Sequence, residues 1–220
     1  ASKMVWKVMP DDATRMNALT SKAVQAIDLV PDLSIETLKA SSAVESVQGF
    51  ALLFAMFNCG SAPFNNVKNR QAFLYALDME KVVKTAYLGN ATPATSFVQD
   101  THPSYKKAKV VYTLDQAKAK ALFAETGLKS IRLLCTDHGW VKKATPIIKE
   151  SLEAAGLSVD FTEKKSSDVY NTIDGKPEAF DAVIAPGDPS VFGADVDLLM
   201  RWWYAGDTWT DKRTVSYTHL

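Results

Sequence analysis

Two loops in the second half of the chain carry acidic, basic and aromatic side chains of the kinds that bind small charged molecules. Residues 136–140 read Thr-Asp-His-Gly-Trp and lead into Lys142 and Lys143, whereas residues 186–190 read Pro-Gly-Asp-Pro-Ser around Asp188. A carboxylate accepts hydrogen bonds from an amine, and a lysine ammonium donates them to a carboxylate. The two loops therefore offer the means to hold both charged ends of a small ligand.

Each of these side chains also has an ordinary structural explanation. Asp188 precedes a proline and is typical of a turn, while Asp137 is a suitable N-cap for the following helix. Lys142 and Lys143 would equally occupy the solvated face of that helix. Trp140 is a further candidate beside the lysines. An aromatic cluster farther along would stack on a ligand or fill the core: Trp202, Trp203, Tyr204 and Trp209.

The sequence holds none of the common catalytic or nucleotide-binding signatures. No Walker, Gly-x-Gly-x-x-Gly, Gly-x-Ser-x-Gly or His-Glu-x-x-His pattern occurs, and neither Cys59 nor Cys135 has a partner at metal-ligand spacing. An enzyme would have to use Asp137, His138 and Asp188 for acid–base chemistry, without a recognisable nucleophile. We therefore expect no catalysis, no metal site and no cofactor, and we leave open whether the cysteines pair.

The balance of charge disfavours a nucleic-acid partner. The 220 residues include 25 lysines and arginines and 25 aspartates and glutamates, so the formal net charge is zero at pH 7. With 47% hydrophobic residues the chain is able to bury a core. Its longest apolar stretch, residues 50–57, is too short for a membrane-spanning helix.

The candidate loops follow apolar segments that alternate between strand and helix patterns. These patterns predict strands over residues 131–135, 157–161 and 180–185, separated by helices over 141–155 and 169–173. The alternation is typical of an α/β domain whose parallel strands are covered by helices on both faces. Because open α/β sheets bind ligands at the carboxyl ends of their strands, we expect both loops to line one crevice.

The first part of the chain carries further strand and helix patterns. The predicted elements are, in order, a strand over residues 4–8, a helix over 12–19, a strand over 26–30, a short helix capped by Ser34, and strands over 44–47 and 51–57. Turn-forming residues 58–63 then predict a domain hinge. Two consecutive helices are expected between residues 67 and 88, followed by a loop over 90–112. A capping box at residues 113–116 predicts a helix that Gly127 ends.

One segment, residues 63–78, reads PFNNVKNRQAFLYALD. It resembles the PF-D-VRQAL-YAID segment of the family 5 solute-binding proteins, the peptide and nickel receptors of ABC transporters. Weaker matches to that family follow one another in order along the chain, at residues 10–15, 26–28, 53–58, 89–93, 114–118, 151–157 and 180–181. The order and spacing of the matches extend the resemblance over nearly the whole chain.

The resemblance implies a two-lobed receptor of which this chain is an internal part. It implies an α/β fold with a periplasmic-binding-protein-like lobe, in which a mixed or parallel sheet is flanked by helices, plus part of a first lobe. Residues 1–57 would be the incomplete portion of that first lobe, and residues 58–214 the second, ligand-binding lobe. Residues 215–220 resemble a translated sequencing adaptor, so we expect native sequence to end near Thr214.

The same resemblance gives the candidate residues specific roles. Asp188 aligns with the aspartate that receives the free amino group of the ligand in peptide-binding members. Lys142 or Lys143 falls where some dipeptide receptors carry an arginine for the ligand carboxylate, although lysine offers a point charge in place of a planar fork. The family often has a tryptophan three positions before the aspartate, where this chain has Ala185.

We therefore interpret the chain as part of a receptor that closes two lobes over a peptide or another small ligand with amine and carboxylate groups. The receptor would deliver this ligand to an ABC permease in the membrane, and we expect the intact receptor to be a monomer. Its expected location is periplasmic or extracellular, including a lipoprotein-anchored parent protein. The alternatives are a hydrolytic enzyme and a ligand-sensing module of a regulator.

Overall fold

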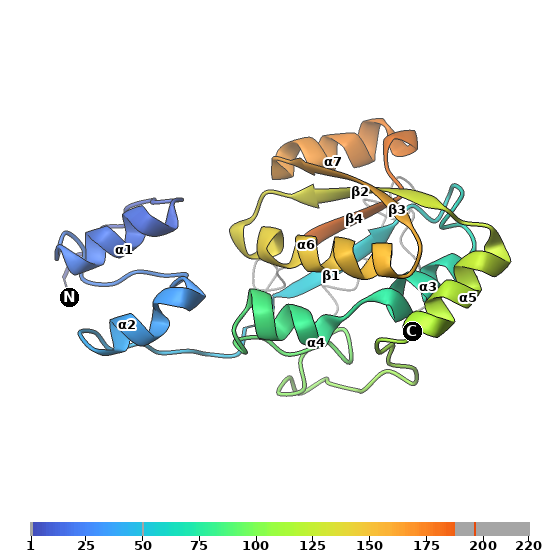
Figure 1. Ribbon diagram of the computed structural model, residues 1–220. Helices are drawn as coiled ribbons and strands as arrows, with labels where there is room; N and C mark the ends of the chain where they lie inside the picture. The colour runs from blue at the N-terminus through green and yellow to red at the C-terminus, as the bar shows by residue number, and fades with distance from the viewer. Residues whose placement is uncertain (1, 50, 188–195, 197–220) are drawn as a thin grey trace. The chain divides into compact units, whose positions relative to one another are not determined.

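The computed structural model describes residues 2–49, 51–187 and 196 (Figure 1). Contacts within the chain divide it into two compact units, with the boundary between Val47 and Gln48. No helix in the described ranges is long and apolar enough to cross a membrane.

The first unit consists of two helices joined by a segment of turns and bends, which confirms both helices predicted there. These are α1 (Asp12–Thr20) and α2 (Ile35–Lys39), the latter preceded by the 3₁₀ turn η1 (Asp32–Ser34). Asp11 caps α1 by accepting hydrogen bonds from the hydroxyl and from the backbone N–H of Thr14. The bond from the hydroxyl, and after it the bond from the backbone, lower the pKa of Asp11.

The strands predicted over residues 4–8, 26–30 and 44–47 do not form in the described structure, so these predictions are wrong. A β-branched segment becomes a strand only when another strand satisfies its backbone groups, because β-propensity depends on context. Among the described residues, no strand pairs with these three segments.

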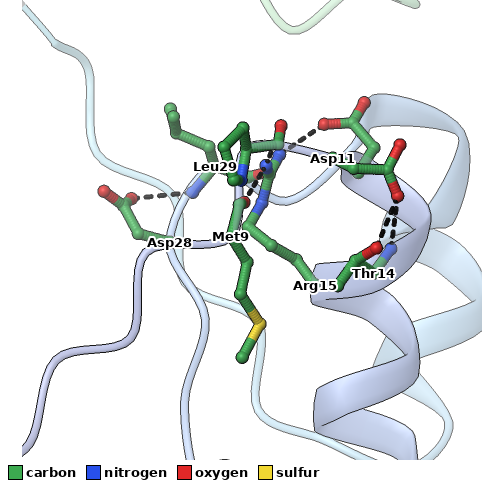
Figure 2. Close-up of polar contacts among 8 residues, drawn as sticks. Met9, Asp11, Thr14, Arg15, Asp28 and Leu29 are labelled. Atoms are coloured by element: carbon green, nitrogen blue, oxygen red, sulfur yellow. Dashed lines mark hydrogen bonds and ion pairs between the residues drawn. The ribbon is translucent and has the colours of Figure 1, made fainter.

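Arg15 satisfies several backbone carbonyl groups in the first unit (Figure 2). Its guanidinium donates hydrogen bonds to the carbonyl oxygens of Met9 and Pro10, each at 2.9 Å, and of Leu29 at 3.1 Å. It also forms an ion pair with Asp12. A guanidinium presents five N–H donors in a fixed fork, so one side chain links the start of α1 to the chain that follows the helix.

The second unit is built around a four-stranded mixed sheet in the order β1-β4-β2-β3 (Figure 1). The strands are β1 (Leu52–Phe57), β2 (Ser130–Thr136), β3 (Ser158–Lys164) and β4 (Ala182–Gly187). β2 pairs in parallel with both β3 and β4, whereas β1, an outer strand of this sheet, pairs antiparallel with β4. The strands predicted over residues 51–57, 131–135, 157–161 and 180–185 are thus confirmed, as is the α/β fold class.

Helices cover both faces of this sheet. They are α3 (Val67–Ala76), α4 (Met79–Lys81), the π-helical turn η2 (Val82–Ala86), α5 (Gln116–Thr126), α6 (Gly139–Ala154), α7 (Ser166–Gly175) and the 3₁₀ turn η3 (Pro177–Ala179). α6 lies on one face and α7 on the other (Figure 1). The larger core joins Leu133 of the sheet with side chains of α3, α5 and α6, and a smaller core joins Val183 with α7.

The start of α5 differs from the prediction. Its N-cap is Asp115, whose Oδ1 accepts the backbone N–H of Lys118 at 2.9 Å, so the predicted capping box at Thr113 is wrong. Gln116 does not reach back to the backbone N–H of Thr113. It donates hydrogen bonds to the carbonyl oxygens of Ala76 and Ser151. The predicted end of the helix at Gly127 is confirmed, with φ at 73°.

The boundary between the two units precedes β1, whereas the hinge predicted from turn residues follows it. After β1 the chain turns through residues 58–63, and the backbone N–H of Asn58 donates to the carbonyl oxygen of Asp181 at 2.8 Å. This bond continues the contact between β1 and the start of β4 beyond the strand itself. The assignment of residues 1–57 and 58–214 to two lobes of a receptor stays a prediction.

Candidate functional site

The carboxyl ends of β2, β3 and β4 lie at one edge of the sheet, as predicted from the alternation of strands and helices. β2 and β3 end side by side, with Thr136 in register with Lys164. The loop after β2 and the first turn of α6 bring Asp137, Trp140 and Lys142 to this edge, with Lys143 beside them. Asp188 and the aromatic cluster at residues 202–209 lie outside the described residues.

Asp137 joins two loops at the edge of the sheet. Its Oδ1 accepts a hydrogen bond from the backbone N–H of Ser166, at 3.1 Å, in the first turn of α7. The N-cap position of α6 is occupied by His138, which makes no side-chain capping bond. The capping role considered for Asp137 therefore exists, but on α7 and not on the helix that directly follows it.

Lys142 is engaged in an ion pair that the sequence interpretation did not include. Its Nζ lies 2.8 Å from Oε1 of Glu163, and the two side chains are 46% and 37% exposed. The hydrogen bond to Glu163 raises the pKa of Lys142, and the negative charges of Glu163 and Asp137 add to this effect. The ammonium of Lys142 therefore stays charged at neutral pH, with a carboxylate already beside it.

Glu163 reaches Lys142 because of its position in β3. Val159, Phe161 and Glu163 alternate along the strand and therefore share one face of the sheet. Val159 and Phe161 pack into the core on the α6 side. Glu163 is the last residue of this row, where the first turn of α6 begins, and it is in register with Cys135. The period-two pattern would have identified Glu163 if the predicted strand had continued beyond residue 161.

Trp140 fixes the start of α6 against the rest of the unit. Its half-buried side chain packs against the larger core, and its carbonyl oxygen accepts a hydrogen bond from the hydroxyl of Tyr87 at 2.9 Å. Tyr87 directly follows η2, so this bond ties the first turn of α6 to that turn. The contact holds in place the backbone from which Lys142 and Lys143 extend.

His138 and Asp137 do not form an acid–base pair among the described residues. Nδ1 of His138 lies 3.1 Å from Oγ1 of Thr136, while Asp137 accepts a hydrogen bond from the backbone of α7.

Cys59 and Cys135 are not joined by a disulfide, and burial raises the pKa of the Cys135 thiol. Within residues 2–49 and 51–187, no three potential metal-binding side chains gather.

Comparisons with known proteins agree with this architecture. Residues 1–219 match the family described as "Bacterial extracellular solute-binding proteins, family 5 Middle". Heme-binding protein A of Haemophilus influenzae is 33% identical over 128 residues, which cover 57% of this chain and 23% of that protein. The dipeptide-binding protein of Escherichia coli (strain K12) is 27% identical over 128 residues, covering 57% of this chain and 24% of its own.

A solved structure of similar fold is NikA from Staphylococcus aureus in complex with Ni(L-His)2. Its TM-score is 0.78 at 21% identity, and the match covers 96% of this chain and 46% of NikA. At this level of identity the likeness shows the fold alone, and it confirms the predicted type of lobe. The chain spans less than half the length of each of these three proteins.

Proposed function

Because this chain belongs to the bacterial extracellular solute-binding proteins of family 5, we propose that it is part of a receptor that captures a small solute for an ABC importer. The family match along residues 1–219 is the observation that carries this proposal. The mixed sheet with helices on both faces supports it, since relatives of this fold close two lobes around a bound solute. The ABC permease would be the partner that receives the solute.

The proposed ligand is a peptide or another small molecule with an amine at one end and a carboxylate at the other. The dipeptide-binding protein among the relatives supports a peptide. Lys142 and Lys143 would face the carboxylate, Asp188 would accept hydrogen bonds from the amine, and Trp140 would supply apolar surface between them. Asp137 would act indirectly, by holding the loop after β2 against α7.

Location outside the cytoplasm follows from the same family, whose members are periplasmic or extracellular. A receptor there needs only to bind and release, because the permease moves the solute across the membrane. Enclosure between two lobes removes most of the ligand from water, which strengthens each charged hydrogen bond to it. The described lobe would supply one wall of that enclosure.

A hydrolytic role has less support. The relatives that match this chain are binding proteins, and the carboxylate of Asp137 is engaged with the backbone of Ser166. We expect no turnover of peptide or ester substrates. We also expect His138→Ala to change only the local packing around residue 138. Saturable hydrolysis that disappears in His138→Ala would contradict the receptor proposal.

Thermal-shift screening of a full-length relative and of this chain tests the proposal. The panel contains dipeptides, glutathione, heme and Ni(L-His)2, which are the ligands named for relatives. A rise in melting temperature with one ligand class, confirmed by calorimetry, is the expected result for the full-length relative. No stabilisation by any member of a broadened panel of amine- and carboxylate-bearing solutes would reject the receptor function.

A further inference from the structure

Lys142 is the cation that the proposed receptor would use for a ligand carboxylate, and it already forms an ion pair with Glu163. The two charged atoms are 2.8 Å apart, and both side chains remain partly exposed at the carboxyl edge of the sheet. Among the described residues, Asp137 in the neighbouring loop also acts on Lys142, and it too is negative. A carboxylate arriving at this ammonium would therefore meet two negative groups already in place.

This arrangement is held by the fold and does not depend on two flexible side chains alone. Glu163 stands on β3 in register with Cys135 of β2, so its backbone is fixed by the parallel ladder. Lys142 extends from the first turn of α6, which the Tyr87–Trp140 hydrogen bond anchors. Both partners therefore start from backbone positions that packing and hydrogen bonds determine.

We propose that Glu163 is a specificity-determining residue that serves as the resident counter-ion of Lys142, so that an anionic ligand group binds there only by displacing it. This inference rests on the proposed function, because it concerns the same ligand carboxylate. With Glu163 in place, the ion pair has no net charge. A ligand with an uncharged end therefore binds almost as tightly as one that ends in a carboxylate. Glu163 thereby reduces the preference of the site for free carboxylates and widens the range of ligand ends that it accepts.

The expected size of the effect follows from the exposure of the pair. Exposed ion pairs contribute little, so displacing Glu163 should reduce carboxylate affinity by about two- to fivefold. A single carboxylate–amide exchange on the ligand is therefore the appropriate comparison. The two probes are alanyl-alanine and its C-terminal amide, which differ in charge at that end only.

Nuclear magnetic resonance titration of the 220-residue chain provides the measurement, because it detects dissociation constants in the millimolar range. Glu163→Gln should bind alanyl-alanine about two- to fivefold more tightly than the wild type does, with affinity for the amide unchanged. Lys142→Gln should remove the preference for the acid. Glu153→Gln is the matched control, since it makes the same change in an ion pair with Lys149 elsewhere on α6.

A ligand-free measurement accompanies the titration. In Glu163→Gln the pKa of Lys142, followed by the ¹³Cε shift, should fall relative to the wild type, because its hydrogen-bonded anion is lost. An unchanged pKa would mean that the pair does not form in solution, and the inference would be overturned.

The titration separates failure of this inference from failure of the proposed function. If the wild type binds both probes and Glu163→Gln leaves their affinity ratio unchanged, the role of Glu163 is rejected while the receptor function stands. If neither probe binds any variant, Lys142 takes no peptide carboxylate and the inference is again rejected. In that case the solute panel on a full-length relative still decides the receptor function independently.

Discussion

Charged side chains at the carboxyl edge of the sheet differ in what they do for the protein. Asp137 is committed to the backbone of α7, so its removal would loosen a loop before it affected any ligand. Lys142 and Glu163 form an ion pair with each other, and both side chains remain partly exposed. Exposed pairs exchange partners at low cost, whereas a carboxylate that caps a helix is worth about 1 kcal/mol to the fold. The edge therefore combines a structural aspartate with an exchangeable pair.

Asp188→Asn in the intact receptor should weaken binding of an amine-bearing ligand roughly ten- to hundredfold, since a charged hydrogen bond is worth about 1.5–3 kcal/mol. The substitution keeps the shape of the side chain and removes its charge, so folding should change far less than binding. Isothermal titration calorimetry gives the affinity, and thermal melting gives the stability. Equal affinity of variant and wild type would leave Asp188 as a turn residue.

At the scale of elements, the starts and ends of helices depend on individual residues that the structure identifies. Asp115 begins α5, Gly127 ends it, and Gly156 follows α6 with φ at 95°. β4 ends at Gly187, where an added Cβ would lie 1.4 Å from Cε2 of Phe54 on β1. These positions carry specific local requirements, and two of them lead to measurable predictions.

Asp115→Ala should destabilise the protein by about 1 kcal/mol, because the backbone N–H of Lys118 loses its capping partner. Thr113→Ala is the matched control, since Thr113 precedes the helix without capping it, and it should change stability by no more than about 0.5 kcal/mol. Urea denaturation of the three proteins gives the free energies of unfolding. A larger loss in Thr113→Ala than in Asp115→Ala would restore the capping box that the sequence suggested.

Gly187→Ala should destabilise the β1–β4 pair by about 1–3 kcal/mol, because the new methyl group would overlap the ring of Phe54. The loss of unfolding free energy in the double variant Phe54→Ala/Gly187→Ala should then be smaller than the sum of the losses in the two single variants, since the overlap disappears with the ring. Chemical denaturation of all four proteins closes the cycle. Strict additivity would show that the ring moves aside at no cost.

The sequence predicted the second unit better than the first, for a physical reason. In the second unit, local signals agree with tertiary contacts: apolar periodicity sets α6 against the sheet, and Gly127 stops α5. In the first unit, residues 4–8 have a strand-like composition, but a strand also needs a partner. The sequence predicted that Lys142 lies in the first turns of the helix after β2, and the structure places it there, whereas its role in binding stays a prediction. The sequence missed Glu163, because the ion pair joins residues whose proximity depends on the register of β2 and β3.

At the scale of the whole molecule, the described chain leaves large apolar side chains in contact with solvent. Met4, Trp6 and Val8 in the first unit are 72%, 82% and 92% exposed. Apolar groups this exposed and this close in sequence mark a surface that another segment or molecule is suited to cover. In the proposed receptor, the second unit would supply one wall of the enclosure that two lobes form around a ligand.

The 220-residue chain should therefore bind its ligand weakly, with a dissociation constant well above the micromolar range, even though the described part of its second unit contains a four-stranded sheet. One lobe desolvates only part of a ligand and leaves Lys142 facing water, so each contact contributes little. Calorimetry on the monomeric chain, with a full-length relative as the reference, measures the difference. Micromolar or tighter binding by the chain would show that one lobe suffices.

The order of the strands in the sheet also governs how the chain folds as it is made. β1 leaves the ribosome before the other three strands, but it pairs with β4, the last of them. The contact between the side chain of Asn58 and the carbonyl oxygen of Phe180 spans 122 residues. Closing so long a loop is slow, so pulse-labelling hydrogen exchange should find β1 amides protected after those of β2 and β3. Until β4 emerges, the nascent chain carries the apolar segment LLFAMF unpaired, so we expect chaperones that shield unfolded strands to bind it.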